Sequence, residues 1–144
     1  MAFDPVSFFG NPANAPPIAA LLGWKLLEFD ADKGWIKVGF EPKPDFLNPA
    51  GLVQGGMLVA MLDDTVGPAV IVASNGQAYT TTIDLHTHFL RPVKLGPITT
   101  EATVTRLGRS VAFTEARLFD SEGRLCARAT SSASVGPMPG GANA

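Results

Sequence analysis

The sequence is poor in the residues that build covalent or metal cross-links. Its single cysteine, Cys126, excludes an internal disulfide, and two histidines are too few for a structural zinc site at the usual spacing. Eleven basic against thirteen acidic residues give a net charge of −2, and no basic run could follow a phosphate backbone. We therefore expect no structural metal, no redox cofactor and no nucleic-acid partner.

Charged residues are also scarce. They make up 17% of the 144 residues, below the roughly 25% of an average soluble domain, so subunit contacts are expected to hide part of the surface. The first residues lack the basic region and apolar core of a signal peptide, and no later run approaches the length of a membrane span. We expect a cytoplasmic homo-oligomer without membrane contact, with a single domain over 1–144.

The elements that the sequence does contain follow a simple order. Prolines make residues 1–15 an irregular arm, and the ordered core is expected at about 16–136, with a flexible tail at 137–144. A short helix closed by Gly23 precedes a hairpin of two strands, and a long apolar helix precedes four more strands. The stretches with strand alternation after the long helix are "AYTTTIDLHTHFLRP", "PITTEATVTRLG", "SVAFTEARLFD" and "RLCARATSSASV".

The long helix, predicted over residues 57–74, has no polar face apart from Asp63 and Asp64. Such a helix must be wrapped by protein, which predicts an α+β fold with a curved sheet around it. Pro68 has no N–H for the carbonyl of Asp64, so a kink or break is expected just after the two carboxylates. Either carboxylate could instead reach solvent there or pair with a core arginine.

The amino end of this helix is a candidate binding site. Gly55 and Gly56 let a ligand approach the backbone, and the first N–H groups of a helix suit an oxyanion. Asn48 and Gln54 add amide groups beside it. Asp63 lies about 12 Å farther along the axis, so it can act there only on the Gly55 of a second, antiparallel helix across a twofold axis.

These residues resemble those of hotdog-fold acyl-CoA thioesterases of the phenylacetate (PaaI) type. The resemblance covers about residues 16–136 and rests on order and spacing: strand, strand, loop with Asn48, x-G-G, an acid nine positions after x, then four strands. Members of that family usually have H-G-G at the helix start, where this chain has Gln54 before its two glycines. The resemblance implies a hotdog fold, which is an antiparallel sheet of about six strands around a long central helix.

The resemblance also implies roles for individual residues. Gly55 would donate its N–H to the thioester carbonyl, and Asp63 of the other subunit would be the nucleophile or the general base that activates water. A Ser or Thr near the start of the next strand helps place that water in some relatives. Anchoring on "IDL" selects Thr82, which we prefer, although strand alternation puts Thr81 on the apolar face. Gln54 can hold a ligand but cannot change charge near neutral pH.

The implied substrate is a small to medium acyl- or aryl-acyl-CoA, with coenzyme A as part of the substrate and no other cofactor. Guanidinium groups suit its phosphates, and the candidates are Arg91, Arg106 and Arg109. The acyl pocket is expected near Phe46, Leu47, Leu90 and Pro92. A dimer or a dimer of dimers would preserve the twofold site. The alternatives are a non-catalytic acyl-CoA-binding protein and, ranked last, a related hydratase.

Three further residues have simpler interpretations. His86 and His88, two apart on a strand, point the same way and could in principle share a metal, but solvated or subunit-contact histidines explain them. Cys126 is expected to be a small core residue, because no histidine is near it in sequence to activate it.

Overall fold

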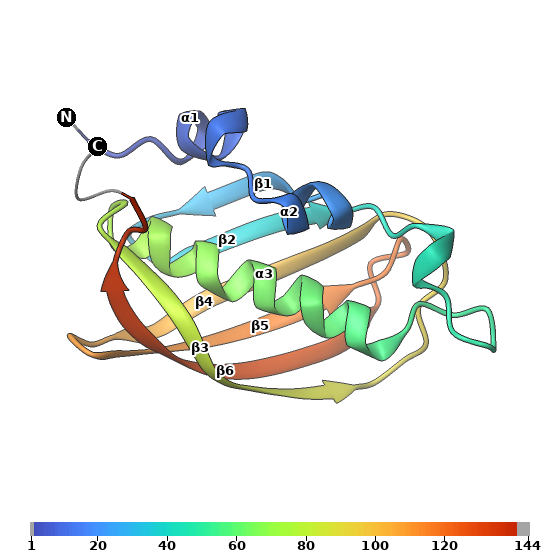
Figure 1. The fold of residues 1–144 in the computed structure, drawn as a ribbon. Helices are drawn as coiled ribbons and strands as arrows, with labels where there is room; N and C mark the ends of the chain where they lie inside the picture. The colour runs from blue at the N-terminus through green and yellow to red at the C-terminus, as the bar shows by residue number, and fades with distance from the viewer. Residues whose placement is uncertain (1, 141–144) are drawn as a thin grey trace.

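The computed structural model describes residues 2–140. Its regular elements, drawn in Figure 1, are two short helices, a hairpin, one long helix and four strands, which is the predicted order apart from the first short helix. The helices are α1 (Pro5–Gly10), α2 (Pro17–Leu22) and α3 (Gly55–Ala73), with 3₁₀ turns at Pro12–Asn14 and Pro44–Phe46. The strands are β1 (Lys25–Asp30), β2 (Trp35–Phe40), β3 (Ala78–Phe89), β4 (Ile98–Leu107), β5 (Val111–Phe119) and β6 (Leu125–Pro137).

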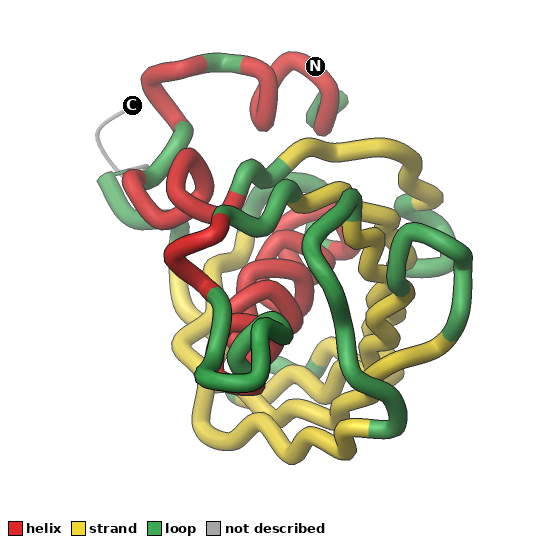
Figure 2. The backbone as a smooth tube through the Cα atoms, turned by 90° about the vertical axis from the view of Figure 1, so that its right-hand side faces the viewer, coloured by secondary structure: helices red, strands yellow, loops and turns green. Residues whose placement is uncertain are grey.

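The six strands form one antiparallel sheet in the order β1-β2-β4-β5-β6-β3, so β1 and β3 are its edges. The sheet curves around α3, which packs against β2, β3, β4 and β5 (Figure 2). The expected α+β hotdog architecture, a curved sheet of six strands around a central helix, is confirmed.

The core forms where α3 meets the concave face of the sheet. Met61 and Leu62 of the helix are fully buried against apolar strand residues such as Ile36, Val38 and Leu118. Complete burial of each such side chain contributes about 1.5–3 kcal/mol. At 19 residues and a mean hydropathy of 1.6, α3 has the length and composition of a membrane span, so the expectation that no run is long enough is wrong. Here the sheet covers the helix.

The amino-terminal arm is more regular than expected. Residues 5–10 form α1, because Asp4 caps its start by accepting from the Val6 N–H at 3.0 Å and Pro5 occupies the first turn. Phe9 of α1 lies against Trp24, with ring centroids 4.9 Å apart. The predicted irregular arm is therefore wrong over this stretch.

The other boundaries lie close to their predicted positions. The short helix α2 closes at Gly23 in the left-handed conformation (φ 72°), as predicted. At the other end of the chain, β6 runs to Pro137, one residue into the segment expected to be flexible. Residues 141–144 of that segment lie outside the described residues.

Helix α3 continues through Pro68, so the predicted break is wrong. The indole N–H of Trp24 donates to the carbonyl of Asp64 at 2.7 Å. This is the carbonyl that Pro68 leaves without its usual helical partner. The Trp24 side chain, 40 residues earlier in the sequence, therefore supplies the hydrogen-bond donor that Pro68 cannot give to this carbonyl.

Candidate active site

The start of α3 presents backbone rather than side chains. Gln54 is the N-cap residue, but its exposed side chain makes no capping bond, and the N–H groups of Gly55 and Gly56 donate to no residue in the described part of the chain. A methyl group on Gly55 would lie 3.3 Å from the ring of Phe89, whereas Gly56 faces open space. These N–H groups, at the positive end of the helix dipole, can therefore bind a carbonyl oxygen.

Asn48 shapes the loop before the helix. Its side-chain oxygen accepts from the N–H groups of Ala50 and Leu52, at 3.0 and 3.1 Å, and its own N–H donates to the Leu52 carbonyl at 2.7 Å. The side-chain oxygen is thus committed to the turn. Only the side-chain NH₂ group of Asn48 is left for a ligand.

A hollow of about 290 Å³ opens beside this loop. It brings together Asn48, Gly55 and Arg91 from the predicted site, and Leu90 and Pro92 from the predicted acyl pocket. The guanidinium of Arg91 also donates to the backbone carbonyl of Leu125 at 2.6 Å.

Other predicted residues lie apart from the hollow. Phe46 belongs to the core and is 5% exposed. Leu47 is packed against the same core. Arg106, at the end of β4, and Arg109, in the β4–β5 turn, are exposed and are not among the hollow's lining residues.

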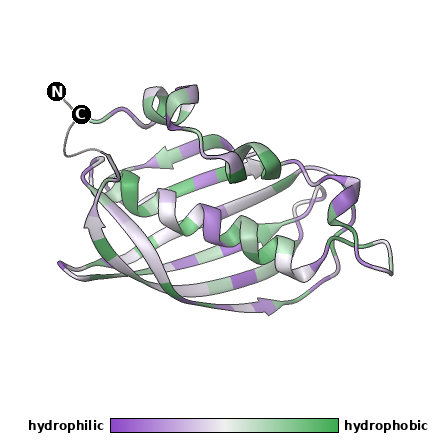
Figure 3. Cartoon of the chain, in the orientation of Figure 1, coloured by the Kyte–Doolittle hydropathy of each residue, from purple (hydrophilic) through white to green (hydrophobic). Residues whose placement is uncertain are grey.

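Asp63 lies near the middle of α3. Figure 3 shows a hydrophilic stretch in the middle part of this otherwise mostly apolar helix. The Asp63 carboxylate is exposed and accepts a 2.7 Å hydrogen bond from the hydroxyl of Thr82 on β3. The strand alternation that assigned Thr81 to this face is wrong, because the pairing of β3 with β6 shifts register between Thr82 and Asp84. The extra residue, Ile83, is a bulge that reverses the alternation, so Thr82 faces the helix.

Asp64 has a different environment from its neighbour. It is half-buried, and its Oδ2 has no hydrogen-bond partner among the described residues. Burial, and secondarily the charge of Asp63, raises the pKa of Asp64 to about 7. Neither carboxylate pairs with an arginine in the part of the chain that the structure describes. Asp63 is hydrogen-bonded at the surface, whereas Asp64 is half-buried with a pKa raised to about 7.

The two parts of the site are separate within one chain. Gly55 and Asp63 are eight residues apart on a continuous helix, about 12 Å along its axis. One chain therefore presents an oxyanion-binding helix start and a positioned carboxylate, but does not bring them together.

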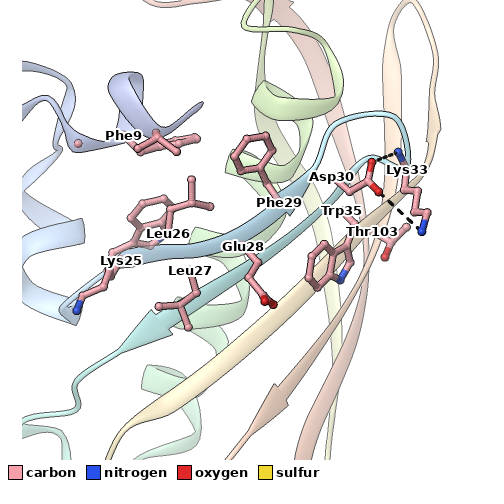
Figure 4. A pocket seen from close by; sticks show the side chains of 13 residues that line it. Phe9, Lys25, Leu26, Leu27, Glu28, Phe29, Asp30, Lys33, Trp35 and Thr103 are labelled. Carbon is pink, nitrogen blue, oxygen red and sulfur yellow. Dashed lines mark hydrogen bonds and ion pairs between the residues drawn. The ribbon is translucent and has the colours of Figure 1, made fainter. Parts of the chain in front are cut away.

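A second and larger groove was missed by the sequence reasoning. It holds about 940 Å³ between α1 and the edge strand β1, and Figure 4 shows Phe9, Leu27, Phe29 and Trp35 around it. None of the predicted site residues lines it. In the sequence, the apolar residues of the amino-terminal arm are the one indication of this groove. The groove forms because part of that arm folds as α1 and lies over β1.

Comparisons with known proteins show the family to which this chain belongs. The thioesterase superfamily model matches residues 50–127, just over half of the chain, from the loop before α3 into β6. The chain belongs to the thioesterase superfamily. The match includes Gly55, Asp63 and Thr82, so the thioesterase-superfamily region spans the helix and the first three strands after it.

Individual relatives of this superfamily member agree. The structure of a phenylacetic acid degradation-related protein from Ralstonia eutropha is 34% identical, with a TM-score of 0.80 over 88% of this chain and 98% of that one. A protein from Sulfurisphaera tokodaii, named as an esterase, is 30% identical over 67% of this chain and 71% of its own length. A hypothetical thioesterase from Streptococcus pneumoniae, solved with coenzyme A, shares the fold at 21% identity, with a TM-score of 0.73 over 82% and 90% of the two chains. The resemblance to PaaI-type hotdog thioesterases is confirmed.

Proposed function

We propose that this superfamily member is an acyl-CoA thioesterase that hydrolyses small to medium acyl- or aryl-acyl-CoA esters. The observation that most directly supports this proposal is the 2.7 Å hydrogen bond from the Thr82 hydroxyl to the Asp63 carboxylate. This bond holds one carboxylate oxygen, Oδ1, of an exposed acid and leaves the other, Oδ2, available to a substrate or a water.

The hollow at the start of α3 would hold the thioester. The N–H of Gly55 would bind its carbonyl oxygen and stabilise the negative charge that develops there during attack. The apolar side chains of Leu58, Phe89 and Leu90 would contact the acyl group. The coenzyme A in the Streptococcus pneumoniae structure of the same fold supports this substrate class.

A homodimer, or a dimer of dimers, would complete each site. The edge strand β3 leaves one side of its backbone unpaired and exposes Tyr79, Ile83 and Phe89, by 43%, 62% and 54%. An exposed apolar edge favours pairing with a second copy. Antiparallel α3 helices across that twofold axis would then bring the Asp63 of one chain to the Gly55 of its partner.

Two chemical routes fit this geometry. As a general base, Asp63 would take a proton from water while the water oxygen attacks the thioester carbon. As a nucleophile, it would form a mixed anhydride that water then hydrolyses. In both, the C–S bond breaks, the coenzyme A sulfur leaves and is protonated, and the acyl group leaves as a carboxylic acid. Neither needs a cofactor beyond the coenzyme A of the substrate.

Gln54 supports a second candidate, a non-catalytic acyl-CoA-binding protein. The residue stands where the related family usually has histidine, and its exposed side chain caps nothing. Without a titratable group there, binding could persist while turnover is lost. The two functions differ in one observable, the release of free thiol.

The test is thiol release from a panel of aliphatic and aromatic acyl-CoA esters. We expect Asp63→Asn to lower turnover by at least about a hundredfold, since it removes the base or nucleophile. Thr82→Val should lower it about five- to tenfold by freeing the carboxylate. The matched control is Asp32→Asn, in the exposed β1–β2 turn. Absence of turnover on every ester, with coenzyme A still bound, would establish the binding protein instead.

A further inference from the structure

The only two histidines of the chain lie together on the outer face of β3. His86 Nε2 and His88 Nε2 are 3.3 Å apart, and the rings meet nearly at right angles (83°). Leu85, which alternates with them along the strand, packs on the core side, and both histidines are exposed. The two nitrogens therefore lie close together on a solvent-exposed face.

Their spacing matches a metal chelate. Two nitrogens that bind one tetrahedral zinc ion at 2.0–2.1 Å lie about 3.3–3.4 Å from each other. We propose that His86 and His88 form a binding site for a zinc-class divalent cation, with both Nε2 atoms as ligands and water completing the coordination. In the metal-free chain one Nε2 donates a hydrogen bond to the other. The cation replaces that shared proton, and both protons then reside on the Nδ1 atoms.

The neighbouring side chains define how strong this site can be. Asp84 lies on the same face, but its Oδ1 already accepts two bonds from Ser132, and the described residues contain no group of three or more metal-binding side chains. The chain therefore supplies two ligands. Across the strand pair, Thr130 lies opposite His86 and Arg128 opposite His88, and this arginine adds positive charge beside the cation.

This site is independent of the proposed hydrolysis. Thr82 and Asp63 meet on the inner face of the sheet, whereas the histidines lie on the outer face. Pairing of the β3 edge with a second copy uses backbone groups in the plane of the sheet and leaves the outer face open. Cys126, a competing soft ligand, is fully buried.

The experiment is a zinc titration of the tag-free full chain. Calorimetry measures the binding, and NMR of the imidazole nitrogens shows which rings bind the metal. With only two histidines, every imidazole signal is assignable. We expect saturation at one zinc per chain, with both Nε2 signals shifting together. His86→Asn or His88→Asn should each lower the affinity about tenfold or more, and the double variant should abolish binding. Magnesium, which prefers oxygen ligands, should shift neither ring.

Two matched variants separate this site from general surface binding. Glu115→Gln removes a carboxylate from β5, which β6 separates from the histidines, and should change zinc affinity much less than the loss of either histidine. Arg128→Gln removes the adjacent positive charge and should tighten binding. Unchanged affinity in the double histidine variant, or imidazole signals that stay fixed at millimolar zinc, would overturn the proposal.

Discussion

At the scale of single residues, one step along α3 separates two carboxylates with different chemistry. Asp63 is exposed and held by Thr82, while Asp64 turns into partly buried surroundings where its Oδ2 has no described partner. Burial raises the pKa of Asp64 to about 7, so this carboxyl is about half protonated at neutral pH.

The Asp64 carboxyl should make stability depend on pH. Its pKa is raised from 3.8 to about 7, so the folded chain holds a proton that the unfolded chain releases near pH 4. The stability that this group contributes is complete below about pH 4 and is lost as the pH rises to about 7. Asp64→Asn should therefore gain stability relative to wild type across this window, by about 1–2 kcal/mol after allowance for partial exposure.

Urea unfolding of both proteins from pH 4 to pH 8 measures this difference. The gain should level off above pH 7, and Asp32→Asn in the exposed turn should show no such slope. A difference that stays flat from pH 4 to pH 8 would show that Asp64 ionises as freely in the folded chain as in the unfolded one.

At the scale of elements, α3 depends on a residue outside it. The Trp24 indole satisfies the Asp64 carbonyl that Pro68 leaves open. Trp24→Phe should lower the free energy of unfolding by about 1–2 kcal/mol, since the carbonyl loses its donor. Pro68→Ala restores an N–H in the helix that can bond to the Asp64 carbonyl. Trp24→Phe should therefore lower the free energy of unfolding by less in the Pro68→Ala protein than in the wild type.

A double-mutant cycle by chemical denaturation measures this coupling. Trp35→Phe is the matched control, because the Trp35 indole donates to no residue that the structure describes. Additive effects of Trp24→Phe and Pro68→Ala would show that the indole does not replace the missing helical bond.

At the scale of the whole molecule, the proposed function depends on the β3 edge. Ile83→Asp places a charge on its most exposed apolar residue, and we expect it to shift the proposed dimer to monomer and to abolish thiol release together. Sedimentation and thiol release measure the two effects. Leu27→Asp, 43% exposed on the opposite edge strand β1, should leave the dimer intact. A stable dimer of the Ile83→Asp protein would place the twofold axis elsewhere.

The sequence predicted what depends on local pattern. The period of the strands and the apolar length of α3 predicted a curved sheet around a long helix. The resemblance to PaaI-type thioesterases, which includes the spacing from Gln54 to Asp63, implied the hotdog fold and the family. Two of the errors concern contacts between distant segments. Helix α3 continues through Pro68, and the Asp64 carbonyl that Pro68 leaves open accepts from Trp24, 40 residues away.

The same holds for the candidate site. The face of Thr82 depends on how β3 pairs with β6, more than 40 residues later, which alternation along one strand cannot reveal. The groove between α1 and β1 exists only once two segments meet. The roles of Gly55, Asn48 and the arginines remain predictions.

The bulge at Ile83 makes β3 two half-strands of opposite phase. Before it, the even-numbered Thr80 and Thr82 face the helix; after it, the odd-numbered Leu85 and Thr87 do. A substitution scan along the strand should therefore show its pattern of tolerance invert at this residue. Deleting Ile83 should give a regular strand in which Thr82 still faces the helix and Asp84 still faces outward, because their partners Ala133 and Ser132 are consecutive on β6. The two faces of β3 are thus set by its pairing with β6 and not by odd and even positions along the strand.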